Sequence, residues 1–392
     1  MEMTIPPTPI PTPTLGRRVR QRVELWFETY GTFPLVLWVG TRLAYMGMSV
    51  VGLALIPTLY YHPDLRQKFL EPYPALDGLC RWDCGWMVTV VKDGYSTAEN
   101  AKIFPLFPLI GWAVERVTGI HHLLVFLLVS NLAALAAYYL IFHLFRQLEG
   151  EQSARWALGL LVAYPFAYFQ AQAQPESLMM LLTAASLLLA FRGQHIWAGV
   201  LLGLGVMARH VAIFYGPALL IAQIKQRGFR KFLWSPSVFG LVVPFLFVGA
   251  FAWYLKVKVG DPLAFWNART IGWGDLVWYG WLQILKNIPY SDRPEFYFFM
   301  ITGLIPWVGA IALATKKHWW ELAAAAITSM VIFYSGGVAT GLGRYTASVW
   351  PAFLPLGIYV ANRPALQIPL IIAFSLFQGL YFFMFSHQFR VF

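Results

Sequence analysis

The stretch "HLLVFLLVSNLAALAAYYLIFHLF", residues 122–145, is apolar almost throughout and holds no acidic residue, lysine or arginine. Similar runs recur along the chain, so that 58% of its 392 residues are hydrophobic and 12% are charged. Soluble domains hold about a quarter charged residues. A soluble core of this length cannot hide so much apolar surface, so we expect lipid to surround much of it. The runs lack the period-two alternation of barrel strands, and the sequence therefore predicts an all-α integral membrane protein.

We predict about eleven membrane spans. They are residues 34–60, 122–146, 154–171, 177–192, 196–208, 211–224, 234–256, 297–315, 319–335, 344–361 and 365–386. The fifth and sixth each cover about 20 Å at about 1.5 Å per residue, less than the roughly 30 Å hydrocarbon core. A single long span centred on Arg209 and His210 is the alternative. Basic clusters on both flanks are expected in the cytoplasm, which requires an even number of crossings and favours two short helices.

The basic residues, which give a formal net charge of +11, lie in short clusters between the apolar runs. This distribution indicates membrane topology with basic turns inside the cell, and it argues against a nucleic-acid partner. We expect residues 1–30 to form a Pro-rich, basic cytoplasmic segment and residues 31–392 to form one transmembrane domain. The two long loops of this multi-pass protein, 61–121 and 257–296, are expected on the extracytoplasmic side.

The chain has two cysteines, Cys80 and Cys84. Four-residue spacing places them one helical turn apart, where disulfide geometry is poor, so a disulfide is the less favoured interpretation. A zinc site is less favoured still, because the chain has no further cysteine to complete one.

The first outer loop contains the most polar stretch of the chain, "RWDCGWMVTVVKDGYSTAENAKIFPLFP" at residues 81–108. Its aromatic residues suit the membrane interface. Residues 105–119 have a helical apolar period with polar interruptions, which predicts a helix lying along the membrane surface. On spacing alone, Asp83 is a solvated loop residue or the N-cap of a helix at 84–92.

Several motifs follow one another in an order that is typical of one family. They are "RWDCGWMVTVVKDGYS" (81–96) with "FPLFPLI" (104–110), "YPFAYFQAQAQPESLMMLLTAASLLLAFRG" (164–193), "WAGVLLGLGVMARHVAIFYGPALL" (197–220) and "LGRYTASVWPAFLPLG" (342–357). Together they resemble the PIG-V-type family, which includes the second mannosyltransferase of glycosylphosphatidylinositol anchor assembly and its prokaryotic relatives. The resemblance extends from residue 34 to about residue 360.

The family is similar to the GT-C glycosyltransferases, so the resemblance implies a GT-C-type helical bundle. It also implies transfer of a hexose, with mannose expected, from a polyprenyl-phosphate sugar to an extracytoplasmic acceptor. Asp83 matches the family's loop aspartate and is the expected general base of an inverting reaction, a role that is worth about 10²–10⁴-fold. The acceptor is left open among glycans, lipids and proteins.

A leaving phosphate requires cations, and Arg209 and Arg344 both lie at predicted outer helix ends. A guanidinium fork suits phosphate, so both are candidate donor-phosphate ligands. The alternative for Arg209 is a topology-setting arginine at the membrane surface. Glu176 is either a site residue or a favourable charge at a helix N-terminus.

Further candidates for substrate binding or for structural support are Arg81, Trp82, Trp86, Tyr95 and Tyr345. The chain departs from the family pattern at three places. Met87 stands where tyrosine is common, Ile103 replaces a phenylalanine, and Gln174-Pro175 replaces Tyr-Thr. These departures affect the expected acceptor more than the expected reaction.

His121 and His122 lie at a predicted helix entrance, where we do not expect them to bind a metal, and no cluster of acids and histidines at metal-ligand spacing is visible in the sequence. We therefore expect a reaction without metal or other cofactor. A transporter or lipid flippase is the alternative class. Transporters usually contain internal repeats, and the two halves of this chain show none.

Overall fold

The computed structural model describes residues 31–55, 74–273, 279–282, 294–335, 341–387 and 389, and within these residues it contains helices and no strand. The all-α prediction is confirmed for this part of the chain. The α-helices are α2 (Phe33–Leu55), α3 (Pro74–Asp77), α4 (Asp83–Asp93), α5 (Leu106–Thr118), α6 (His122–Ala163), α7 (Glu176–Phe191), α8 (His195–Ala208), α9 (Gly216–Arg227), α10 (Phe229–Leu233), α11 (Phe239–Val259), α12 (Ala264–Trp273), α14 (Pro294–Ala314), α15 (Trp320–Tyr334), α16 (Leu342–Thr346), α17 (Phe353–Ala361) and α18 (Pro364–Ser386). Short 3-10 helices connect them: η2 (Ala98–Lys102), η3 (Ala167–Gln170), η4 (His210–Tyr215), η5 (Pro236–Val238), η7 (Lys317–Trp319) and η8 (Trp350–Ala352).

Four described helices are long and apolar enough to cross a membrane. They are Phe33–Gly52 in α2, His122–Ala163 in α6, Pro236–Val259 through α11, and Pro364–Ser386 in α18. Shorter apolar helices accompany them at Glu176–Phe191, His195–Ala208, Thr302–Ala314 and Trp350–Ala361. This set fits a multi-pass membrane protein, while the total of eleven spans stays a prediction.

Two predicted spans are interrupted in the structure. Residues 154–171 are helical only as far as Ala163, because Tyr164 precedes a proline and adopts an extended backbone at φ −53°, ψ 137°. Residues 164–175 then form buried turns around the short 3-10 helix η3. Residues 344–361 are likewise divided, since α16 ends at Thr346 and helix resumes at Trp350.

The chain also breaks at Arg209, where the sequence left two interpretations open. Helix α8 ends at Ala208, Arg209 is extended at φ −156°, ψ 121°, and η4 leads into α9 at Gly216. Two short helices, rather than one long span, are therefore confirmed. The membrane side on which Arg209 lies stays a prediction.

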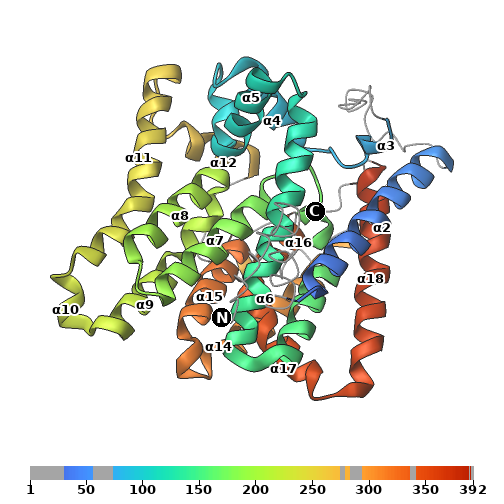
Figure 1. Ribbon diagram of the computed structural model, residues 1–392. Coiled ribbons are helices and arrows are strands. Elements are labelled where there is room, and N and C mark those ends of the chain that lie inside the picture. The colour runs from blue at the N-terminus through green and yellow to red at the C-terminus, as the bar shows by residue number, and fades with distance from the viewer. Residues whose placement is uncertain are drawn as a thin grey trace, which may run out of the picture.

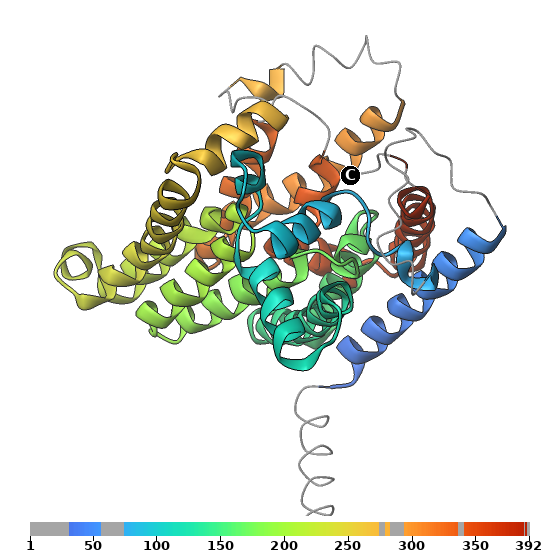
Figure 2. The ribbon, with the colours of Figure 1, turned by 90° about the horizontal axis from the view of Figure 1, so that it is seen from above.

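The predicted inner turns lie together at one end of the bundle. Lys225 pairs with Glu321 at 2.6 Å, and His318 lies 3.5 Å from Glu149. Helices α4, α5 and α12, from the two predicted outer loops, lie together at the opposite end, where η2 packs against α12 (Figure 1). Seen from that end, α2 and α18 flank one side and α8 and α11 the other (Figure 2). The structure thus groups the loops as predicted, while the cytoplasmic location of either end stays a prediction, and residues 1–30 and 61–73 lie outside the described part.

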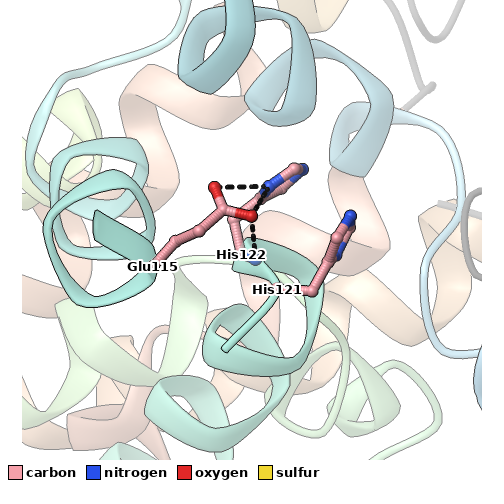
Figure 3. Close-up of side chains that lie close together, drawn as sticks. All are labelled: Glu115, His121 and His122. Carbon is pink, nitrogen blue, oxygen red and sulfur yellow. Dashed lines mark hydrogen bonds and ion pairs between the residues drawn. The ribbon is translucent and has the colours of Figure 1, made fainter. Parts of the chain in front are cut away.

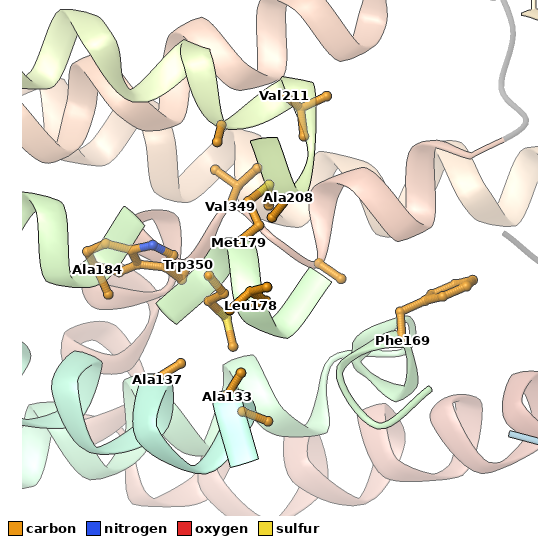
Figure 4. Close-up of a cluster of buried hydrophobic side chains, with 14 of the residues drawn as sticks. Ala133, Ala137, Phe169, Leu178, Met179, Ala184, Ala208, Val211, Val349 and Trp350 are labelled. Atoms are coloured by element: carbon orange, nitrogen blue, oxygen red, sulfur yellow. The ribbon is translucent and has the colours of Figure 1, made fainter. Parts of the chain in front are cut away.

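A buried cluster around Trp350 anchors the segment that follows α16. The Trp350 ring lies 5.9 Å from that of Phe145 and 6.2 Å from that of Tyr215, and its indole N–H donates to Thr183 at 3.3 Å. Small and apolar side chains from α6, α7 and α8 fill the space around it, as Figure 4 shows with Ala133, Ala137, Leu178, Met179, Ala184 and Ala208. The cluster fixes the stretch that begins at Arg344, six residues before Trp350 in the sequence.

Candidate active site

Asp83 is the first residue of α4, and it directly follows a tight turn at Trp82. Trp82 has φ 54°, the one positive φ among the described non-glycine residues. It occupies the N-cap position of α4 without a side-chain cap hydrogen bond. The interpretation of Asp83 as an N-cap is therefore wrong. The Asp83 carboxylate instead pairs directly with Arg344, both residues line a pocket, and the Asp83 side chain is 26% exposed.

A disulfide joins Cys80 to Cys84, with the two Cα atoms 5.4 Å apart, and both residues are fully buried. The expectation against a disulfide is wrong, because it assumed one continuous helix through both residues. Cys80 lies before the turn at Trp82, outside α4, and this turn brings its side chain back toward Cys84. The cross-link therefore encloses Asp83 and holds the start of α4.

Arg344 lies in the short helix α16, which two glycines position. Gly341 has φ +87°, a conformation that side chains rarely adopt, and an added Cβ at Gly343 would lie 2.3 Å from the ring of Phe166. Arg344 Nη1 donates to Asp83 Oδ2 at 2.5 Å. Its guanidinium also lies over the ring of Phe169, 5.1 Å from the centroid. The glycine-rich setting thus lets a buried arginine reach the outer loop.

Glu176 accepts from both candidate phosphate ligands. It is the first residue of α7, and its Oε1 contacts Arg344 Nε and Arg209 Nη1. Its side chain is 4% exposed, against 7% for Arg344 and 10% for Arg209. Arg209 also lies over the ring of Tyr345, 5.0 Å from the centroid. Glu176 therefore holds the two arginines side by side, a function that goes beyond a favourable charge at a helix N-terminus.

The charges around Asp83 favour its ionised form. Burial alone raises the pKa of this carboxyl, but the neighbouring Arg344 and Arg209, with a smaller effect of Lys102, hold the pKa below its ordinary value. Such a carboxylate is an acceptor at neutral pH. As long as Arg344 is bound to it, however, it is a weak base.

An open pocket lies over this ion-pair cluster. Its charged wall consists of Asp83, Lys102, Arg209 and Arg344, and its other walls include Met87, Ile103, Phe104, Phe107, Pro108, Pro175 and Tyr345. Three of the positions at which the chain departs from the family pattern, Met87, Ile103 and Pro175, thus line the pocket. A pocket with one charged wall and apolar walls elsewhere suits a ligand that has both a phosphate and a lipid chain.

Two other candidate residues support the loop. Arg81 is buried, pairs with Asp77 at 2.8 Å, and donates to the backbone oxygen of Ser386 at 3.0 Å. The Tyr95 hydroxyl donates to the backbone oxygen of Ile103 at 2.8 Å. Of the two functions that the sequence left open for these residues, the structure favours the structural one.

Lys102 and His210 line the pocket but were not singled out from the sequence. Lys102 Nζ lies 3.3 Å from the ring centroid of Trp86, another candidate, and 3.1 Å from Glu99. Burial above all, with help from Arg209, lowers the pKa of His210 to about 3, so its imidazole is neutral. The polar loop sequence gives a signal for Lys102, whereas none marks His210.

Among the residues that the structure describes, one cluster with metal-ligand spacing lies away from this pocket, contrary to the expectation from the sequence. Glu115, His121 and His122 bring one ligand atom each to within 4.8 Å of the others. The sequence did not reveal the group. The turn between α5 and α6 brings His121 and His122 back toward Glu115, which precedes them by six and seven residues.

Comparison with known protein families agrees with a pocket that suits a phosphate with a lipid chain. Residues 104–254 match the family described as dolichyl-phosphate-mannose-protein mannosyltransferase. The match runs from the pocket wall at Phe104 through Glu176 and Arg209 into α11. It supports a membrane glycosyltransferase of the GT-C type. Comparison with curated proteins gives no match.

Proposed function

We propose that this protein is a GT-C glycosyltransferase that moves a hexose, in the first place mannose, from a polyprenyl-phosphate sugar to an extracytoplasmic acceptor. One observation carries the proposal. Segments more than 250 residues apart in the chain bring Asp83 and Arg344 to 2.5 Å of each other at a pocket. In this arrangement the carboxylate can accept a proton, and the two guanidiniums beside it can neutralise a leaving phosphate.

The sharing of Arg344 between two carboxylates indicates how Asp83 becomes an active base. Arg344 is shared between Asp83 and Glu176, so a donor phosphate has to compete with Asp83 for Arg344. When the phosphate takes the guanidinium, Asp83 loses its main counter-charge and its pKa rises toward the value that burial favours. Donor binding and activation of the base are therefore coupled.

The transfer step follows from these positions. Asp83 takes the proton of the acceptor hydroxyl while that oxygen forms a bond to the anomeric carbon. The bond from the anomeric carbon to the phosphate oxygen breaks, and its electron pair leaves on the phosphate beside Arg344 and Arg209. The acceptor attacks opposite the leaving group, so the configuration inverts, and no covalent sugar–enzyme intermediate forms. Neither a metal nor another cofactor takes part in the proposed step.

The finer assignment rests on the motifs. The PIG-V-type pattern around Asp83 and Arg344 supports membership of that group, and the predicted topology supports a site outside the cytoplasm. Met87, Ile103 and Pro175 line the pocket where the chain departs from the pattern, so we expect them to influence which acceptor fits.

The test is transfer of labelled mannose from a short polyprenyl-phosphate mannose by the purified protein in detergent, with membrane extracts as acceptor. We expect Asp83→Asn to reduce turnover by at least about 100-fold, the usual scale for a general base. Asp93→Asn is the matched control, because Asp93 ends the same helix and is exposed. Near-normal transfer by Asp83→Asn would remove the base from the mechanism. Movement of the donor across vesicle membranes without sugar transfer would favour a flippase instead.

A further inference from the structure

Glu115, His121 and His122 meet at the corner between α5 and α6 (Figure 3). Both carboxylate oxygens of Glu115 lie near His122 Nδ1, at 3.1 and 3.0 Å, and one also accepts from the His122 backbone N–H at 3.2 Å. The rings of His121 and His122 are stacked with centroids 4.2 Å apart. Gly119, in the left-handed conformation at φ 74°, ends α5 and makes this sharp return possible.

The corner closes a tightly packed interface between the two helices. Phe107, Gly111 and Glu115 follow one another at intervals of four residues along one face of α5. Phe107 stacks on Phe126 of α6 at 4.8 Å, and an added Cβ at Gly111 would lie 2.3 Å from the same ring. Glu115 continues this face to His122, one turn before Phe126. The group is thus held by the packing of both helices, with His122 only 3% exposed.

We propose that Glu115, His121 and His122 form a binding site for a divalent transition metal of the Zn²⁺ class. Two imidazoles and one carboxylate are a ligand set that such ions prefer, whereas Mg²⁺ and Ca²⁺ favour oxygen ligands. Tetrahedral ligand atoms at about 2.0–2.2 Å from zinc lie roughly 3.3 Å apart. The Glu115 carboxylate oxygens lie 3.1 and 3.0 Å from His122 Nδ1, which is close to this separation. His121 is exposed, and its Nδ1 accepts from the Leu123 backbone N–H at 3.3 Å, so its ring has to turn away from this contact to complete the site. The metal replaces the proton between His122 and Glu115, and water fills the fourth position.

A bound ion stiffens the support of the pocket without taking part in transfer. Phe107 and Pro108, in the first turn of α5, line the pocket over Asp83. The metal closes the other end of the same helix against α6. Its binding therefore fixes the orientation of one pocket wall, whatever substrate the pocket takes, and the proposal does not depend on the proposed function.

The experiment measures metal content and stability of the detergent-solubilised full chain, purified on a tag without histidine. After incubation with Zn²⁺ and desalting, we expect about one retained ion per chain, and with Co²⁺ we expect the visible absorption of a low-symmetry site. His121→Gln should weaken zinc binding by at least about 10-fold, because the loss of even an outer-shell partner costs about 10–100-fold, while the Glu115–His122 contact stays in place. Zn²⁺ should raise the melting temperature of the wild type and leave that of His121→Gln unchanged.

His318→Gln is the matched control, because His318 is an exposed histidine that also lies near a glutamate, Glu149, at 3.5 Å. This variant should bind zinc as the wild type does. Equal zinc retention by the wild type and His121→Gln would overturn the site, and so would a wild type that retains none. A loss of zinc in His318→Gln to the same degree would place the ion at the opposite end of the bundle.

Discussion

Replacement of Arg344 tests the phosphate assignment most directly. Its Nη1 and Nε face two different carboxylates, those of Asp83 and Glu176, and its side chain is only 7% exposed. Removing a charge-assisted hydrogen bond from such a site costs about 2–4 kcal/mol. At 1.4 kcal/mol per tenfold, Arg344→Ala should lower kcat/KM for the donor by about 30- to 700-fold. Arg344→Lys should recover part of this activity, because lysine keeps the charge but has one nitrogen in place of the fork.

The assay is donor titration at fixed acceptor, with initial rates of transfer for the wild type and both variants. Arg116→Ala is the control, since Arg116 is an exposed arginine on α5 near the same end of the bundle. Thermal unfolding of each protein separates weaker donor binding from impaired folding. If donor dependence stays unchanged while acceptor dependence rises, Arg344 belongs to the acceptor side and the phosphate assignment is wrong.

Three further predictions concern acid sensitivity, topology and the disulfide. The pKa of Asp83 is lower in the folded protein than in the unfolded chain, where it is about 3.9. The stability that its ion pair contributes is therefore complete above the unfolded pKa. This stability is lost as the pH falls through the lower, folded pKa. The melting-temperature advantage of the wild type over Asp83→Asn should therefore shrink as pH falls below about 4, and a pH-independent difference would contradict the ion pair. Cysteines introduced at Glu151 and Pro262 should react with impermeant reagents from opposite sides of the membrane, and labelling from one side would refute the predicted topology. Replacing both Cys80 and Cys84 by serine should lower the free energy of unfolding by about 2 kcal/mol for so short a loop, measured by denaturant titration, and should reduce transfer by loosening α4; unchanged stability and activity would show that the cross-link does not hold Asp83.

Helix positions were largely predictable, because apolar runs and their polar ends mark them locally. Helix α7 occupies residues 176–191 against a predicted 177–192, and α18 occupies 364–386 against 365–386. The prediction failed at residues 164–171, whose composition is also apolar. There Pro165 ends the helix, and tertiary burial of the following turns decides the rest. Local composition cannot distinguish a buried turn from a buried helix.

The members of the candidate site were predictable one by one, but their partnership was not. Asp83 and Arg344 each stand in a distinctive local motif, yet 261 residues separate them. The sharing of Glu176 by two arginines depends on where α7, α8 and α16 come together, which no spacing in the sequence encodes. The disulfide was missed for a related reason, since the turn at Trp82 changes the direction of the chain between its two cysteines.

The pairing of two carboxylates with two arginines in the cluster has a consequence for release of the spent carrier. Asp83 and Glu176 balance the charges of Arg209 and Arg344, so each charge in the cluster has a partner, whereas a buried charge that loses its partner costs about 3–5 kcal/mol. Under the proposed mechanism, the lipid phosphate that remains after transfer leaves while these carboxylates recapture the arginines. Competition between the carboxylates and the phosphate for the two arginines limits donor affinity. The same competition promotes release of the lipid phosphate, so release of a tightly bound phosphate does not have to limit turnover.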